Sequence, residues 1–176
     1  MSSRKDLLER NSTFVADFTG GELPIQPRFR QLVLSCVDAR ADPAHYLGLE
    51  PGDALVMRTL GGRVTDGAEE GIAVLANLMT AMGGPVGGPP LDVLIVHHTD
   101  CGLERLADES WRSKLSQMSG VDKGVLDALA IHDHDAALEA DVLRLRGSKI
   151  LSGSVTVSGY LYDHASGTLT EVHPAD

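Results

Sequence analysis

The sequence predicts one α/β domain, residues 1–176, built on a mostly parallel central sheet that is flanked by helices, with a helical arm at its N-terminus. Two observations predict this class. Short, almost continuously apolar segments, typical of strands buried on both faces, alternate with segments of helical periodicity. The length of 176 residues, with 43% apolar and 23% charged residues, fits one globular domain.

Residues 1–30 are expected to form the arm and a connector ahead of the sheet. The spacing of apolar residues over 2–18 predicts a helix, and glycines and prolines punctuate residues 20–27. The first strand is predicted at residues 31–37, where the run Gln-Leu-Val-Leu-Ser-Cys-Val suits a strand covered on both faces.

A short helix is predicted over residues 43–49, because Asp42 is a good N-cap and proline fits the first helical position. The Pro-Gly-Asp turn that follows leads into a second strand at residues 54–59. Helical spacing of apolar residues then predicts an amphipathic helix over residues 65–82, with Gly83 as its C-cap.

The glycine- and proline-rich residues 83–90 are expected to form a surface loop, and the apolar residues 91–97 a third central strand. The next region is mostly helical, most clearly over residues 133–146. Two further strands, at residues 155–162 and 168–172, flank a turn sequence and predict a hairpin.

The charge balance bears on possible partners. With 15 basic and 25 acidic residues the net charge is −10, which repels nucleic-acid phosphates and anionic membrane surfaces. The first ten residues lack a signal-peptide core, and no apolar stretch is long enough for a membrane span, so a cytoplasmic protein is expected. Cys36 and Cys101 are too few for a disulfide framework, which leaves both thiols available to a metal.

Candidate functional residues follow two of the predicted strands. Cys36, Asp38 and Arg40 come at the end of the first strand, and His98 and Cys101 at the end of the third. In open α/β sheets this edge is where ligands and catalytic groups gather. Two thiolates and one imidazole suit zinc and leave one coordination position for water, while the carboxylate and guanidinium are placed to pair beside the metal.

The same residues allow two other interpretations. Both cysteines could be buried core residues, since free cysteine is often buried, but the joint pattern favours a metal site. A redox pair is less favoured because the two cysteines lack CxxC spacing. His97 is expected to point away from His98, into the core or an interface, because successive side chains of a strand face opposite sides.

Four further polar residues are predicted to cap helices or to face solvent. In the His-Asp-His-Asp run from His132 to Asp135, Asp133 is predicted to be a helix N-cap rather than part of a second metal site. Asp100 is expected to cap the next helix or to face solvent. Glu104 and Asp108, one helical turn apart, are expected to lie on a solvated face.

The motifs together resemble the β-class carbonic anhydrases. The resemblance extends from about residue 32 to 102, and more loosely to residues 160–169. It rests on Cys36-Val-Asp-Ala-Arg40, Leu47-Gly-Leu-Glu-Pro-Gly-Asp-Ala-Leu-Val-Met-Arg58, Gly61-Gly-Arg-Val-Thr65 and Val96-His-His-Thr-Asp-Cys-Gly102. The resemblance implies that Cys36, His98 and Cys101 bind zinc and that Asp38 and Arg40 form the catalytic dyad.

The resemblance also implies a mechanism and an assembly. A zinc-bound hydroxide attacks CO2 to give bicarbonate, and Asp38, held by Arg40, orients that hydroxide. In some members of the family the aspartate instead becomes the fourth zinc ligand and closes the site. The implied unit is a homodimer or a higher homo-oligomer, with the N-terminal helix reaching over its partner.

The sequence departs from the family pattern at two places. Thr59 and Leu60 follow Arg58 where the family has asparagine and alanine, and Val33 occupies a position that is tryptophan in members with an inhibitory bicarbonate pocket. Two alternative functions therefore stay open. One is hydrolysis of carbonyl sulfide or carbon disulfide at the same zinc site, and the other is a catalytically inactive zinc-binding subunit.

Overall fold

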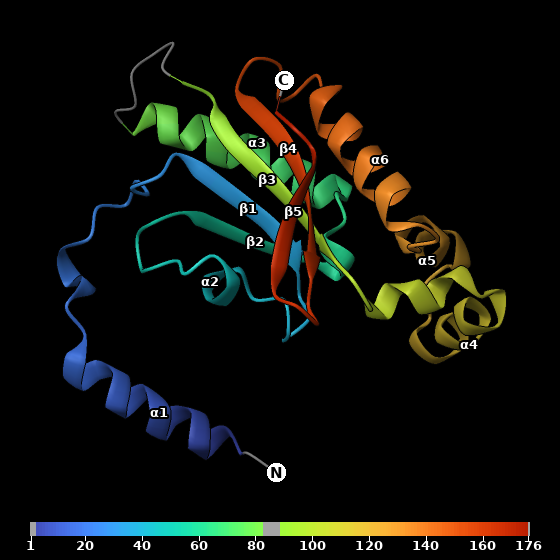
Figure 1. Ribbon diagram of the computed structural model, residues 1–176, viewed down its shortest axis with the longest axis horizontal. Helices are drawn as coiled ribbons and strands as arrows, with labels where there is room; N and C mark the ends of the chain where they lie inside the picture. Colours follow the sequence, from blue (N-terminus) through green and yellow to red (C-terminus); the bar gives the residue numbers. More distant parts are fainter. Residues whose placement is uncertain (1–2, 83–88, 176) are drawn as a thin grey trace.

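The computed structural model describes residues 3–82 and 89–175 and has the predicted α/β class. Four strands run parallel and the fifth is antiparallel to the fourth, in the order β2-β1-β3-β4-β5 (Figure 1). The strands are β1 (Gln31–Cys36), β2 (Leu55–Thr59), β3 (Leu91–His98), β4 (Val155–Asp163) and β5 (Thr168–His173).

Helices lie on both faces of this sheet. The larger core packs Leu32 and Ile95 of the sheet against Ile72 of α3 and Leu138 of α6. On the opposite face, the ring of Tyr46 in α2 stacks on that of Tyr162. The α-helices are α1 (Arg4–Asp17), α2 (Pro43–Tyr46), α3 (Asp66–Ala81), α4 (Glu109–Ser119), α5 (Lys123–Leu129) and α6 (His134–Arg146), and the 3-10 segments are η1 (Gly20–Glu22), η2 (Leu60–Gly62) and η3 (Gly102–Ala107).

The predicted helix starts are confirmed by their caps. The side chains of Asp42, Thr65 and Asp133 each accept a hydrogen bond from a backbone amide in the first turn of α2, α3 and α6. The short helix predicted over residues 43–49 ends earlier, because Gly48 has a φ of +62°, which is left-handed rather than helical. The predicted C-cap Gly83 and residues 83–88 of the predicted loop lie outside the described residues.

The N-terminal arm stands apart from the sheet. Helix α1 contains no buried residue and extends away from the rest of the molecule (Figure 1). Its apolar side chains are about half exposed or more: Leu7, Leu8, Phe14 and Val15. Among the described helices, none combines the length and the apolar character that a membrane span requires.

Candidate functional site

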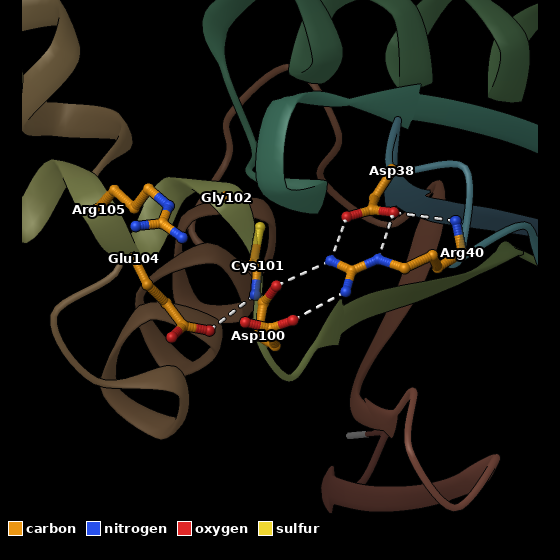
Figure 2. A pocket seen from close by; sticks show the side chains of 7 residues that line it. All are labelled: Asp38, Arg40, Asp100, Cys101, Gly102, Glu104 and Arg105. Carbon is orange, nitrogen blue, oxygen red and sulfur yellow. Dashed lines mark hydrogen bonds and ion pairs between the residues drawn. The ribbon is translucent and has the colours of Figure 1, made fainter.

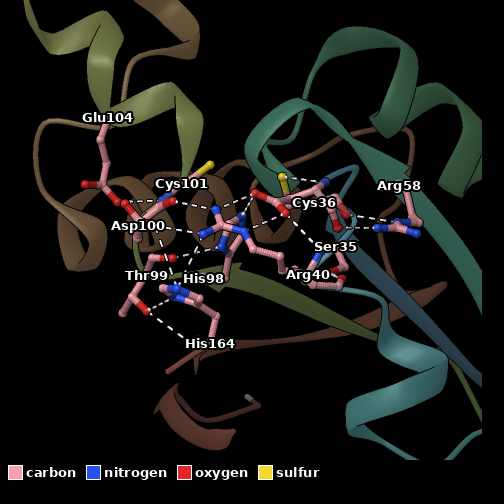
Figure 3. A network of polar contacts seen from close by, with 12 residues as sticks. Ser35, Cys36, Arg40, Arg58, His98, Thr99, Asp100, Cys101, Glu104 and His164 are labelled. Carbon is pink, nitrogen blue, oxygen red and sulfur yellow. Dashed lines mark hydrogen bonds and ion pairs between the residues drawn. The ribbon is translucent and has the colours of Figure 1, made fainter. Parts of the chain in front are cut away.

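The two strands that carry the predicted ligands lie side by side. β1 and β3 are parallel neighbours with Ser35 opposite Val96, so their carboxyl ends, Cys36 and His98, reach the same edge of the sheet. The turn after β3 brings Cys101 back to this point. One donor atom from each of Cys36, His98 and Cys101 lies within 4.8 Å of the others, and all three side chains are buried (Figure 3).

These donor atoms fit a soft or borderline divalent metal. His98 Nδ1 donates a hydrogen bond to the carbonyl of Thr99 at 2.9 Å, which leaves the lone pair on Nε2. That Nε2 atom is buried and has no hydrogen-bond partner, as expected of a ligand atom. The hydrogen bond between the two cysteines lowers the pKa of the Cys36 thiol and raises that of Cys101, so the thiolate of this pair lies on Cys36.

A carboxylate held by a guanidinium lies next to this cluster. Arg40 donates to both oxygens of Asp38, from Nε at 3.1 Å and from Nη2 at 2.8 Å, and the Arg40 backbone amide adds a third bond at 2.9 Å. These bonds hold the pKa of Asp38 well below its usual range. Asp38 Oδ2 lies 3.9 Å from His98 Nε2, so the pair faces the ligand cluster.

Asp100 fixes the other side of Arg40. Its carboxylate accepts from Arg40 Nη1 at 2.8 Å, and its carbonyl accepts from Nη2 at 2.9 Å (Figure 2). Of the two roles predicted for Asp100, the solvent-facing one is confirmed, since its side chain is 68% exposed. Its φ of +53° is unusual for a residue other than glycine and turns the chain toward Cys101.

Arg58 stabilises the loop that carries Asp38 and Arg40, and this role was not predicted from the sequence. It lies in β2 opposite Ser35 and donates to the carbonyls of Cys36 and Asp38 at 2.9 and 2.6 Å. A third bond reaches the Asp42 carboxylate at 3.1 Å. Its place in the PGDALVMR stretch was the available signal, but no local rule pairs an arginine with carbonyls of a neighbouring strand end.

The prediction that Glu104 lies on a solvated face misses its contacts with the site. Its Oε1 accepts a hydrogen bond from the backbone amide of Cys101 at 2.7 Å and contacts His134 Nε2 at 2.9 Å. The start of α6 therefore supports the turn that presents Cys101. Asp108 caps α4 by accepting from Ser110. Among the described residues, the only cluster suited to a metal is the Cys-His-Cys group, so the His132–Asp135 run forms no second one.

His97 points into the core, as predicted, and joins an ionic cluster there. Its Nε2 donates to Asp141 of α6 at 3.0 Å, and the same carboxylate oxygen accepts from Arg63 Nε at 2.6 Å. Burial lowers the pKa of His97, which favours its neutral form. This ionic cluster connects α6, β3 and the segment after η2.

Thr59 and Leu60, two of the three positions that depart from the family pattern, lie beside this segment. Thr59 donates its hydroxyl proton to the carbonyl of Arg63 at 2.9 Å, so it stabilises the turn through η2. Leu60 is half-exposed.

A cavity of about 530 Å³ lies beside Cys101 and the Asp38–Arg40 pair. Its lining consists of Asp38, Arg40, Asp100, Cys101, Gly102, Glu104 and Arg105 (Figure 2).

Comparisons with known proteins agree with this architecture. Residues 31–144 match the family model described as carbonic anhydrase. The chain is 25% identical over 174 residues to β-carbonic anhydrase 1 of Mycobacterium tuberculosis, covering 99% of this chain and 100% of that protein. It is 26% identical over 171 residues to a carbon disulfide hydrolase of Saccharolobus solfataricus, covering 84% and 79% of the two chains.

A solved structure is similar along its full length. The carbonic anhydrase from Streptococcus mutans superimposes with a TM-score of 0.81 and 28% identity, covering 98% of this chain and 99% of that one. The family match spans well over half of the sequence and contains the Cys-His-Cys cluster and the Asp38–Arg40 pair. The chain therefore belongs to the β-class carbonic anhydrases and is an enzyme of that family.

Proposed function

We propose that this protein catalyses the reversible hydration of CO2 to bicarbonate with zinc held by Cys36, His98 and Cys101. The observation that carries the proposal is the convergence of these three donor groups beside a carboxylate that a guanidinium fixes. Zinc bound by such a set lowers the pKa of a water molecule toward neutrality and so supplies a hydroxide nucleophile.

Asp38 acts as a fixed hydrogen-bond acceptor in this proposal. Because Arg40 lowers its pKa, Asp38 is ionised at neutral pH and accepts, but does not donate, a hydrogen bond. The attacking oxygen would donate a hydrogen bond to Asp38 and keep its proton, and this hydrogen bond would orient the oxygen's lone pair toward the CO2 carbon. For Asp38 to become a zinc ligand, its two side-chain bonds from Arg40 would have to break or rearrange. Those bonds favour a site that stays open.

The charged lining of the cavity suits an ionic product such as bicarbonate. It contains the charged groups of Asp38, Arg40, Asp100, Glu104 and Arg105, which can solvate that anion, whereas CO2 and carbon disulfide are both apolar and gain little from them. Hydrolysis of carbon disulfide or carbonyl sulfide is the second candidate, because relatives of 25 to 26% identity over most of the chain are carbon disulfide hydrolases. An inactive zinc-binding subunit is less favoured, since a structural site needs no Asp–Arg pair.

Stopped-flow CO2 hydration tests the proposal. The zinc-loaded protein should turn over CO2 across pH 6 to 9 with a rate that rises through the ionisation of the attacking water. D38A should retain zinc, but its kcat should fall about 10²- to 10³-fold. The control D135A, at an exposed position of α6, should retain both the bound zinc and the wild-type kcat. Hydrogen sulfide release from carbon disulfide without CO2 hydration would favour the second candidate. Zinc binding without either reaction would favour the inactive subunit.

The assembly is part of the same proposal. We infer that the protein is a homodimer whose α1 helix packs on the partner subunit, because α1 exposes Leu8, Phe14 and neighbouring apolar side chains and none of its residues is buried. The double variant L8E/F14E should therefore weaken association. Light scattering after size-exclusion chromatography measures it, and a monomeric wild-type protein would contradict the inference.

A further inference from the structure

Arg105 differs from the other charged residues that line the cavity. It belongs to η3, its side chain is exposed, and Figure 2 draws it on the opposite side of Cys101 from Arg40. Across the described ranges 3–82 and 89–175, no hydrogen bond or ion pair engages its guanidinium group. The group lies over the ring of Trp111, with 5.6 Å from the guanidinium carbon to the ring centroid. Its five N–H donors can therefore bind a ligand.

The other charged groups of the lining already have partners. Arg40 donates to the carboxylates of both Asp38 and Asp100 at 2.8 Å. Glu104 accepts a hydrogen bond from a backbone amide at 2.7 Å. A ligand that recruits one of these groups has to replace an existing bond, whereas a ligand of Arg105 replaces only water. Arg105 is therefore the group of the lining that is best prepared to bind an anion.

The indole ring of Trp111 positions the guanidinium group without neutralising it. Trp111 lies in α4, and the ammonium group of Lys114 contacts the same ring, with Nζ 5.1 Å from the centroid. The electron-rich face of an indole ring attracts a cation, but it carries no net charge. The two cations at this ring also repel each other, and an anion bound beside them would reduce that repulsion. The contact therefore fixes Arg105 and leaves its positive charge uncompensated.

The charge of the whole chain gives such a cation a function. The net charge is −10, and three of the five charged residues in the cavity lining carry carboxylates. This field repels an anion that approaches the cavity. An uncompensated cation in the lining offsets the repulsion locally, and added salt weakens both effects. CO2 has no net charge, so the cation acts on bicarbonate rather than on CO2.

We propose that Arg105 binds a small oxyanion in the cavity, which in the proposed reaction is bicarbonate. The inference rests on the proposed function for the identity of the anion, but not for the existence of the anion site. A planar guanidinium group can donate two parallel hydrogen bonds to two oxygens of such an anion. Arg105 thereby sets the affinity for bicarbonate and for oxyanions of the same shape, such as nitrate. The ring of Trp111 beside it reports their binding.

The test compares the wild type with R105A by two measurements on zinc-loaded protein. Trp111 is the only tryptophan of the chain, so its indole N–H signal is identified directly in NMR spectra. This signal should shift saturably as nitrate is added at constant ionic strength, held with the bulky anion gluconate. The dissociation constant of nitrate should be about three- to tenfold higher in R105A. The inhibition constants of nitrate and of bicarbonate in CO2 hydration should rise by the same factor.

Two further variants separate the charge of Arg105 from its packing. R105K keeps the charge but not the paired donors, so its dissociation constant for nitrate should lie between those of R105A and the wild type. K114A is the matched control, because it removes a cation from the same ring but from outside the cavity lining. It should keep the wild-type constants and the wild-type kcat. The difference between R105A and the wild type should decrease as the ionic strength rises.

Several outcomes would overturn the proposal. A Trp111 signal that does not respond to nitrate in the wild type, or wild-type constants in R105A, would exclude Arg105 as an anion ligand. Equal losses in R105A and R105K would assign the effect to side-chain shape instead of charge, and an equal loss in K114A would assign it to general surface charge. Nitrate binding that depends on Arg105, in a protein that does not hydrate CO2, would remove the proposed function and keep the anion site.

Discussion

Removal of the Asp141 carboxylate should destabilise the protein by an amount that reflects a buried charge. Its side chain is 4% exposed and accepts from Arg63 at 2.6 Å and from His97 at 3.0 Å. In D141A the Arg63 guanidinium, only 12% exposed, loses its counter-charge. Breaking such a pair by removing one partner costs about 3–5 kcal/mol. With an m-value of about 2 kcal/mol/M, the urea midpoint should fall by roughly 1.5–2.5 M.

Urea unfolding at fixed protein concentration measures this effect, and R144A provides the control. Arg144 lies in the same helix and pairs with Glu69 at 2.9 Å, but its side chain is 37% exposed, so its loss should cost at most about 1 kcal/mol. The double variant R63A/D141A should be less destabilised than the sum of its single variants. A D141A effect below about 1 kcal/mol, equal to that of R144A, would refute the reasoning.

Three other predictions concern the site and its surroundings. E104A removes the acceptor of the Cys101 amide and should weaken zinc binding about 10- to 100-fold in chelator competition, while unchanged affinity would exclude this support. G62A should lower the free energy of unfolding by about 2–4 kcal/mol in urea, because φ at Gly62 is +71° and a Cβ there would lie 2.7 Å from a carbonyl oxygen of β3. The control G67A has open space around its added Cβ and should not destabilise the protein. Burial raises the pKa of Tyr46 to about 12 from 10.0, so the free energy of unfolding should fall above pH 10, where the unfolded chain ionises first. Y46F should show a smaller slope, because the raised pKa of Tyr160 still contributes; an equal slope in both proteins would contradict the prediction.

The sequence by itself predicted the class of fold and most of its elements. The helix caps at Asp42 and Asp133 and the apolar strands depend only on residues close in sequence, so their local preferences carry over into the folded chain. It also predicted that Cys36 and His98 would meet, because parallel neighbouring strands end at the same edge of a sheet. The end of α2 at Tyr46 was less predictable, since a glycine can adopt either sign of φ.

The supporting contacts of the site were decided only by tertiary packing. His97 and Asp141 are separated by 44 positions, Arg40 and Asp100 by 60, and Arg40 and His164 by 124. Whether such groups meet depends on where α6 and the β4–β5 hairpin pack, and a single sequence carries no local pattern for that. Donor groups at strand ends follow from the alternation of strands and helices. The partners that orient them follow only from the packed structure, because polar side chains pair with whatever the fold brings within hydrogen-bond distance.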